Sequence, residues 1–346
     1  MSPAEESPPG SPPLRLSVLD QSPIPAQSSG AEALRNTLDL ARLADELGYH
    51  RYWVAEHHGS PALAGASPEV LVGPIAARTD RIRVGSGGVM LPHYSPWKVA
   101  ESFSVLSGLF GDRIDLGLGR GASADAVTTH ALQRDRRVPS PSDFGDQLTE
   151  LIAHLEGRPP PDARFAALGL LPGSPAGPQP WLLGSSLQSA IWAARHGISY
   201  AFGDFINPEG REMTHLYSES FVASATLAAP RVAVCVAAVC ADGDADARRL
   251  ATSARAGAAM QRDGHGTVPV PTVEQAESYL SRRDPDAEES PRRTVVGDPA
   301  AVRARLEELA AEYRANEVMV VTITHSHAAR RRSYELIAEA FGLGRG

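Results

Sequence analysis

Along the chain, short and nearly continuous apolar runs alternate with helical patterns of apolar and polar residues. Continuous apolar runs are typical of strands that are covered on both faces. Between them, apolar residues recur three and four positions apart, as at Leu40, Leu43, Ala44 and Leu47, where the helical pattern ends at Gly48. The apolar runs predict eight strands, at 14–20, 51–57, 82–91, 113–120, 180–186, 199–205, 231–240 and 317–325.

Helical patterns separate these strands. Besides the helix that ends at Gly48, they lie at 67–80, 95–110, near 144–157, 187–196, near 209–227, from the seventh strand to about 263, 300–314 and 331–341. A strand–helix alternation repeated eight times predicts an α/β fold of the (β/α)8 TIM-barrel class. No strand is followed by a G-x-G-x-x-G sequence, which argues against a dinucleotide-binding Rossmann fold. We predict one barrel domain over residues 14–346.

Two segments depart from this alternation. Residues 1–13 are acidic and proline-rich, without the basic and apolar regions of a signal peptide, and predict a disordered tail. Residues 264–297 are polar and charged, and they precede the last strand on the rim where barrel sites lie. This insertion fits a lid over the site and a passive surface segment equally well.

Composition narrows the classes of function. The chain has 346 residues and a net charge of -8, which argues against a general binder of nucleic acid or anionic membranes. No apolar run is long enough to span a bilayer. Cys235 and Cys240 should point to opposite faces of one strand, where they cannot easily form a disulfide, and they lack metal-binding spacing. These features predict a cytoplasmic protein.

Polar residues follow the predicted strands where a barrel carries its chemistry. The second strand ends in Glu56, His57 and His58. Surface histidines are the simplest interpretation, and a zinc site lacks the usual H-E-x-x-H or cysteine pattern. A histidine that faces the barrel cavity would suit general acid–base chemistry.

Glycines and hydroxyls follow the next three strands. Gly87 and Gly88 indicate either a β-bulge or close approach of a flat ligand. Arg120 stands between glycines and could bind a phosphate or form a salt bridge. Ser185, Ser186 and Ser189 open a helix, where hydroxyls and free N–H groups favour phosphate but also serve as ordinary N-caps. Barrel phosphate sites more often follow strands seven and eight.

Seven segments, in their order and spacing, resemble the bacterial luciferase-like, flavin-dependent monooxygenases. The similarity runs from Leu14 to Leu343. The segments are AEHHG (55–59), VGSGGVMLPHYSPWKVAE (84–101), GDRIDLGLGRG (111–121), F-x-x-Q-L-x-E-L (144–151), GSSLQSAIWAARHG (184–197), VVGDP (295–299) and ITHSHAARRRSYELIAEAFG (323–342).

The resemblance implies a role for each of these features. His57 matches the active-site histidine, with His58 as its packed neighbour, and Gly87–Gly88 matches a non-prolyl cis peptide that lies against the isoalloxazine ring. The matches to the FMN phosphate site are Arg120, Ser185, Ser186 and Ser189.

The resemblance also implies a reaction. FMNH2 from a separate NAD(P)H:flavin reductase would react with O2 to give a C4a-hydroperoxide, which oxygenates an organic substrate. The helices at 67–80 and 95–110 would pack against a second subunit in a homodimer. The chain resembles single-subunit relatives from antibiotic biosynthesis in particular. Gly119 replaces the reactive cysteine of the light-emitting luciferase subunit, which argues against light emission.

Three other functions fit part of this pattern. An F420-dependent oxidoreductase of the same superfamily would transfer hydride without oxygen. A non-catalytic flavin-binding protein would resemble the accessory luciferase subunit, which lacks the equivalent of His57. A phosphate-binding barrel without flavin agrees with the residues at the strand ends but not with the seven segments.

Overall fold

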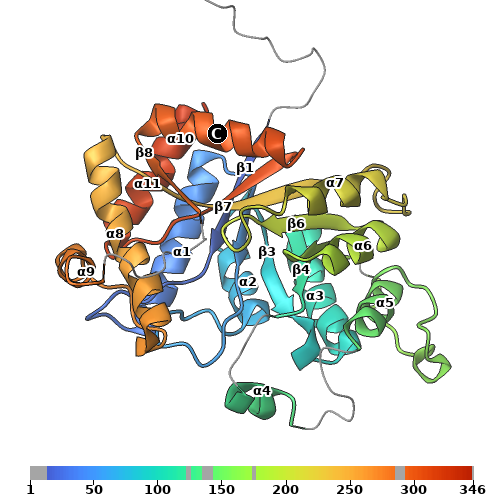
Figure 1. The fold of residues 1–346 in the computed structure, drawn as a ribbon. Coiled ribbons are helices and arrows are strands. Elements are labelled where there is room, and N and C mark those ends of the chain that lie inside the picture. The colour runs from blue at the N-terminus through green and yellow to red at the C-terminus, as the bar shows by residue number, and fades with distance from the viewer. Residues whose placement is uncertain (1–13, 122–125, 135–142, 174–176, 285–292, 345–346) are drawn as a thin grey trace, which may run out of the picture.

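Eight parallel strands form a closed barrel in the computed structural model, which describes residues 14–121, 126–134, 143–173, 177–284 and 293–344 (Figure 1). The barrel strands are β1 (Arg15–Asp20), β2 (Arg51–Val54), β3 (Arg83–Met90), β4 (Ile114–Gly119), β5 (Gln179–Leu183), β6 (Ser199–Gly203), β7 (Val232–Cys240) and β9 (Glu317–Val321). Each strand pairs with the next, and the pairs β7–β9 and β9–β1 close the ring. The predicted (β/α)8 barrel is confirmed.

Helices surround the barrel. They are α1 (Gly30–Leu47), α2 (Pro68–Ala76), α3 (Pro96–Phe110), α4 (Ala126–Leu132), α5 (Phe144–Leu155), α6 (Leu187–His196), α7 (Arg211–Glu219), α8 (Asp244–Met260), α9 (Val273–Leu280), α10 (Pro299–Glu312) and α11 (His327–Ala340). Short 3-10 turns lie at Leu91–His93, Gly111–Arg113 and Ala163–Phe165, and a π-type turn at Gln261–His265 extends α8. Within the described ranges, no helix is both long and apolar enough to cross a membrane.

The segment 264–297 has more regular structure than its polar sequence predicts. It contains α9, which packs on α8, and β8 (Thr294–Gly297), which pairs with the end of β7 outside the barrel ring. Val270 also forms a bridge with Pro25 in the loop after β1. The described parts of the segment are therefore attached to the barrel at several points, and a lid motion stays a prediction. The predicted tail at 1–13 lies outside the described residues.

Helices α4, α7 and α2 also differ from the prediction. The sequence pattern missed α4, and α7 ends at Glu219 instead of near 227. The predicted helix 67–80 ends at Ala76 because another acceptor binds the backbone that follows it. The Asp45 carboxylate accepts hydrogen bonds from the N–H groups of Asp80 at 2.7 Å and Ile82 at 2.8 Å, which turns the chain into β3. The local periodicity of apolar residues cannot predict this contact, because Asp45 is distant in the sequence.

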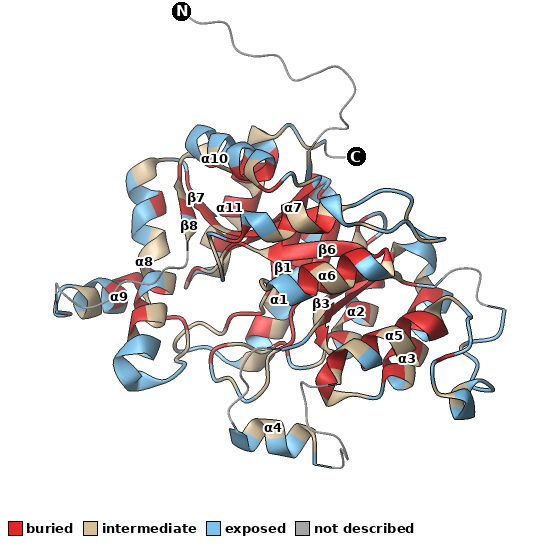
Figure 2. Ribbon diagram, turned by 45° about the vertical axis from the view of Figure 1, so that its right-hand side comes forward, coloured by how far each residue is buried: buried red, intermediate tan, exposed pale blue. Residues whose placement is uncertain are grey.

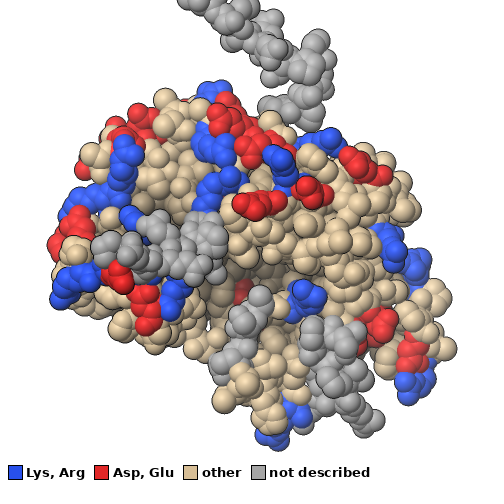
Figure 3. All heavy atoms as spheres, viewed as in Figure 1, with Lys and Arg blue, Asp and Glu red and all other residues tan. Residues whose placement is uncertain are grey.

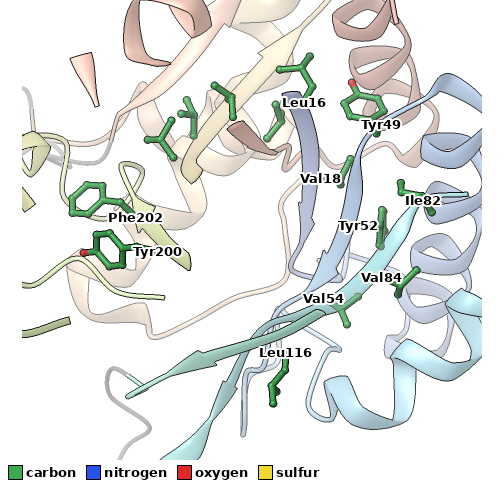
Figure 4. Close-up of a cluster of buried hydrophobic side chains, with 14 of the residues drawn as sticks. Leu16, Val18, Tyr49, Tyr52, Val54, Ile82, Val84, Leu116, Tyr200 and Phe202 are labelled. Atoms are coloured by element: carbon green, nitrogen blue, oxygen red, sulfur yellow. The ribbon is translucent and has the colours of Figure 1, made fainter. Parts of the chain in front are cut away.

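Apolar side chains fill two separate layers. The larger layer lies between the barrel and its helices, and Figure 4 shows Val18, Tyr52 and Val84 of adjacent strands within it. Figure 2 shows the same arrangement as buried strands enclosed by helices with exposed outer faces. A smaller layer fills the barrel interior. Cys235 belongs to the inner layer and Cys240 to the outer one, and both thiols are free, as predicted.

A buried ionic cluster closes the base of the barrel, the end formed by the amino termini of the strands. Arg51 lies 2.6 Å from Asp115 and 2.6 Å from Glu317, and all three side chains are buried. The Trp53 indole donates to the same Asp115 carboxylate at 2.9 Å, and Trp53 packs edge-on against Trp181. Ion pairs and indole rings thus fill the barrel interior at this end. The candidate site lies at the opposite end, the mouth.

Candidate functional site

The predicted site residues come from four strands that are neighbours in the barrel. Strand pairing aligns Val54 of β2 with Ser86 of β3, Met90 of β3 with Gly119 of β4, and Gly119 with Leu183 of β5. The residues that follow these positions, His57, Gly87–Gly88, Arg120 and Ser185, therefore lie side by side along one arc of the mouth. In the space-filling view the molecule is hollowed near the middle of the face shown (Figure 3).

His57 lies just after β2 and is held by its backbone. Its N–H donates to the Gly65 carbonyl at 2.7 Å. The Nδ1 atom of its ring is buried and has no hydrogen-bond partner among the described residues. Burial, and then the nearby His58, lowers the pKa of His57 from 6.5 to about 4. The ring is therefore neutral at pH 7, and its buried Nδ1 is left without a hydrogen-bond partner in the described part of the chain.

His58 has a different environment, which the sequence did not reveal. Its Nε2 lies 2.6 Å from Glu56 Oε1, and Glu56 is only 2% exposed. The same carboxylate accepts from the Tyr94 hydroxyl at 2.8 Å and from the Met90 N–H at 2.9 Å. Burial, and then Glu56, raises the pKa of Tyr94. Glu56 thus ties the ends of β2 and β3 together and fixes His58, which supports its predicted role as a packed neighbour. The E-H-H sequence was the only available signal.

Gly87 and Gly88 are joined by a cis peptide bond, as the family resemblance implied. The β3–β4 register also shifts between Ser86 and Val89, so the irregularity predicted as a β-bulge is present too. A Cβ on Gly87 would lie 2.5 Å from Leu19 Cδ1, and one on Gly88 would lie 2.8 Å from the Gly117 carbonyl oxygen. Only glycine fits this close packing of backbone against the inner core.

The three serines have unequal structural roles. Ser186 is the N-cap of α6, where its Oγ accepts from Ser189 N–H at 3.4 Å, and Ser189 Oγ completes the capping box. Ser189 is buried and also lies 3.2 Å from the Tyr200 hydroxyl. The Ser185 hydroxyl has no hydrogen bond to a described residue, while its carbonyl accepts from Asn207 Nδ2 at 3.4 Å. The capping interpretation therefore holds, with Ser186 as the N-cap and Ser189 as the N3 residue of the capping box. Ser185 has the freest hydroxyl.

Arg120 follows β4 and is exposed, without a salt bridge to a described residue. Its guanidinium is therefore available for an anion beside the start of α6. Asn207, after β6, borders the same place and was not predicted. Among the described residues, no group of three His, Cys, Asp or Glu side chains is close enough to hold a metal ion.

The fold and these residues define a (β/α)8-barrel protein with a polar candidate site at its mouth. The family described as luciferase-like monooxygenase matches residues 14–316. An N-acetyl-S-alkylcysteine monooxygenase of Bacillus subtilis (strain 168) is 37% identical over 331 residues, 94% of this chain and 98% of that protein. The chain thus belongs to the luciferase-like monooxygenase family, a family of oxidoreductases.

Solved structures show the same relationship. The crystal structure of apo-MsnO8 has a TM-score of 0.88 and 39% identity and covers 96% of this chain and 98% of its own. The oxygenating constituent of 3,6-diketocamphane monooxygenase from Pseudomonas putida, solved in complex with FMN, has a TM-score of 0.71 and 19% identity over 94% of this chain and 97% of its own. At that identity, the second similarity concerns the fold alone.

Proposed function

We propose that this protein is a monooxygenase that binds FMNH2 at the mouth of the barrel and transfers one oxygen atom of O2 to a small organic substrate. The observation that carries the proposal is the arc of four adjacent strand ends. From β2 to β5, the arc carries a neutral imidazole, a glycine pair without side chains, an exposed arginine and a helix N-terminus, in that order. The named activity of the relative with 37% identity agrees with it.

The residues present fit FMN. The Gly87–Gly88 backbone, which packs closely against Leu19 and Gly117, would support the flat ring at this strand end. Arg120, the Ser185 hydroxyl and the N–H groups at the start of α6 would hold the phosphate, where a cation and a helix dipole both favour negative charge. Ser186 and Ser189 would act by fixing the helix start through their capping box. When bound, reduced flavin supplies the electrons that activate O2.

His57 would act on protons in this site. Its ring is neutral at pH 7, so Nδ1 or Nε2 can accept a proton or a hydrogen bond without first losing one. Glu56 and Tyr94 hold the adjacent His58 away from this role. The apolar layer and ionic cluster beneath the mouth exclude water from the barrel interior below the site, which favours oxygen transfer to substrate over loss as peroxide.

Two partners complete the proposal. A separate NAD(P)H:flavin reductase would supply FMNH2, and a second copy of the chain would cover α2 and α3. Large apolar side chains on these helices are exposed: Val70 by 63%, Val105 by 45% and Leu109 by 70%. We place the substrate in secondary metabolism, such as antibiotic biosynthesis, on the resemblance of the sequence to enzymes of such pathways.

Anaerobic titration tests the cofactor. We expect purified protein to bind FMNH2 more tightly than reduced F420, and FMN more tightly than riboflavin. On addition of air, we expect bound FMNH2 to be reoxidised more slowly than free FMNH2. Preference for F420, with no effect on oxidation by air, would replace the monooxygenase with a hydride-transferring oxidoreductase. Binding of neither cofactor would refute both functions.

A further inference from the structure

A pocket lies at the base of the barrel, at the opposite end from the mouth. Its volume is about 360 Å³. It is lined by residues at the amino ends of several strands, among them Arg15 of β1, Arg83 of β3 and Arg231 just before β7. None of these residues belongs to the proposed flavin site, so the base pocket is independent of the proposed function.

The base pocket has more positive than negative charge. Arg83 is neutralised by Asp115, which accepts from its Nε at 2.9 Å and its Nη2 at 2.6 Å. Among the described residues, the Arg15 side chain bonds only to His50 Nε2, at 3.4 Å, and the Arg231 side chain makes no hydrogen bond or ion pair. Arg15 and Arg231 therefore lack carboxylate partners within the described part of the chain.

The charges beneath the pocket do not offset this excess. Arg51 and Arg83 are balanced by Asp115 and Glu317, to which they are paired. The carboxylate of Asp112 lines the pocket but is exposed to solvent, where its charge is screened. Arg51 also has a buried nitrogen, Nη2, without an acceptor among the described residues.

Burial and the neighbouring arginines lower the pKa values of two groups in the base pocket. Burial, and then Arg51 and Arg15, lowers the pKa of Arg231. Burial, and then Arg51, lowers the pKa of His50 to about 4, so its ring carries no charge at pH 7. Burial is the larger cause for both groups and disfavours any charge, but the contribution of the arginines has the sign that stabilises an anion.

We propose that the base pocket binds a small organic oxyanion, a phosphate ester or a carboxylate, between Arg15 and Arg231. Guanidinium groups bind both kinds of oxyanion through paired N–H donors. The pocket volume exceeds what one phosphate group needs, and Pro178, Ile198 and Leu227 give it an apolar wall. The ligand would therefore carry a short apolar part beside its charge.

Isothermal titration with inorganic phosphate and with malonate, at constant ionic strength in chloride, tests this site. All titrations use full-length Arg120→Gln protein, so that the arginine of the mouth cannot contribute. We expect this protein to bind at least one of the two anions, and the added Arg231→Gln substitution to weaken binding at least about tenfold, as for a lost charge-assisted hydrogen bond. Preference for phosphate supports a phosphate ester as the ligand, and preference for malonate supports a carboxylate.

A second measurement separates loss of the site from loss of the fold. Without added anion, the Arg231→Gln substitution should leave the melting temperature unchanged or raise it, because it removes an uncompensated charge. If that variant does not fold, Arg15→Gln in the same background should weaken binding similarly. The proposal is overturned if neither anion binds the Arg120→Gln protein, or if the folded double variant binds equally well.

Discussion

His57 should make the stability of the protein depend on pH. Its pKa is about 4 in the folded protein, against 6.5 for an unperturbed histidine, because burial and His58 disfavour its cation. The folded state therefore binds this proton more weakly than the unfolded state does. Its contribution to stability is complete above pH 6.5 and is lost as the pH falls toward 4. At about 1.4 kcal/mol per pH unit, the whole contribution is about 3.5 kcal/mol.

Urea unfolding of wild-type protein and the His57→Gln variant, from pH 7 to about pH 4.5, measures this effect. The free energy of unfolding should fall less in the variant, by about 2–3 kcal/mol over this range, because glutamine does not titrate. His50→Gln is the matched control: its pKa is also about 4, but it lies at the base of the barrel. It should reduce the pH dependence similarly and leave flavin binding unchanged. The reasoning fails if His57→Gln retains the full pH dependence of the wild-type protein while His50→Gln does not.

Three further substitutions test the fold, the phosphate site and the dimer. Gly88→Ala should lower the free energy of unfolding by about 1–3 kcal/mol, because its Cβ would lie 2.8 Å from a β4 carbonyl oxygen. The control, Gly119→Ala, should be nearly neutral in the same urea titration, because its Cβ would have no atom nearer than 3.8 Å. Equal losses of stability in the two variants would contradict the packing. Arg120→Gln should weaken FMN binding at least about tenfold by calorimetry while riboflavin binding is unchanged, because only the phosphate loses its partner; an equal loss for both ligands would place the phosphate elsewhere. Leu109→Ser on α3 should shift the mass measured by light scattering toward that of the monomer. Val127→Ser on α4 changes another exposed apolar side chain and should leave the mass unchanged. A monomeric wild-type protein would refute the dimer.

The barrel could be predicted from the sequence because its strands differ sharply from its helices in apolar pattern. Strands covered on both faces, such as 231–240, are continuous apolar runs, and the observed β7 spans Val232–Cys240. The strand β8 was missed because it is only four residues long and lies within a charged segment. The end of α2 was misplaced because Asp45, far away in sequence, binds the backbone beyond it.

The candidate site was predictable in its positions but not in its contacts. Barrel geometry indicates that residues after consecutive strands meet at the mouth, which suffices for His57, Gly87–Gly88 and Arg120. Which of two adjacent histidines is restrained depends on Glu56 and Tyr94, which are 38 residues apart in the chain. No local pattern encodes that hydrogen bond. The excess positive charge at the base arises in the same way, from arginines on strands that meet only in the folded barrel.

A crystal structure of the protein with FMN would test the central claim most directly. We expect the phosphate between Arg120 and Ser185 at the start of α6, and the flavin ring over Gly87–Gly88 with His57 beside it. An FMN phosphate bound after β7 or β9, or a ring away from the glycine pair, would contradict the assignment of the site to the ends of β2 to β5.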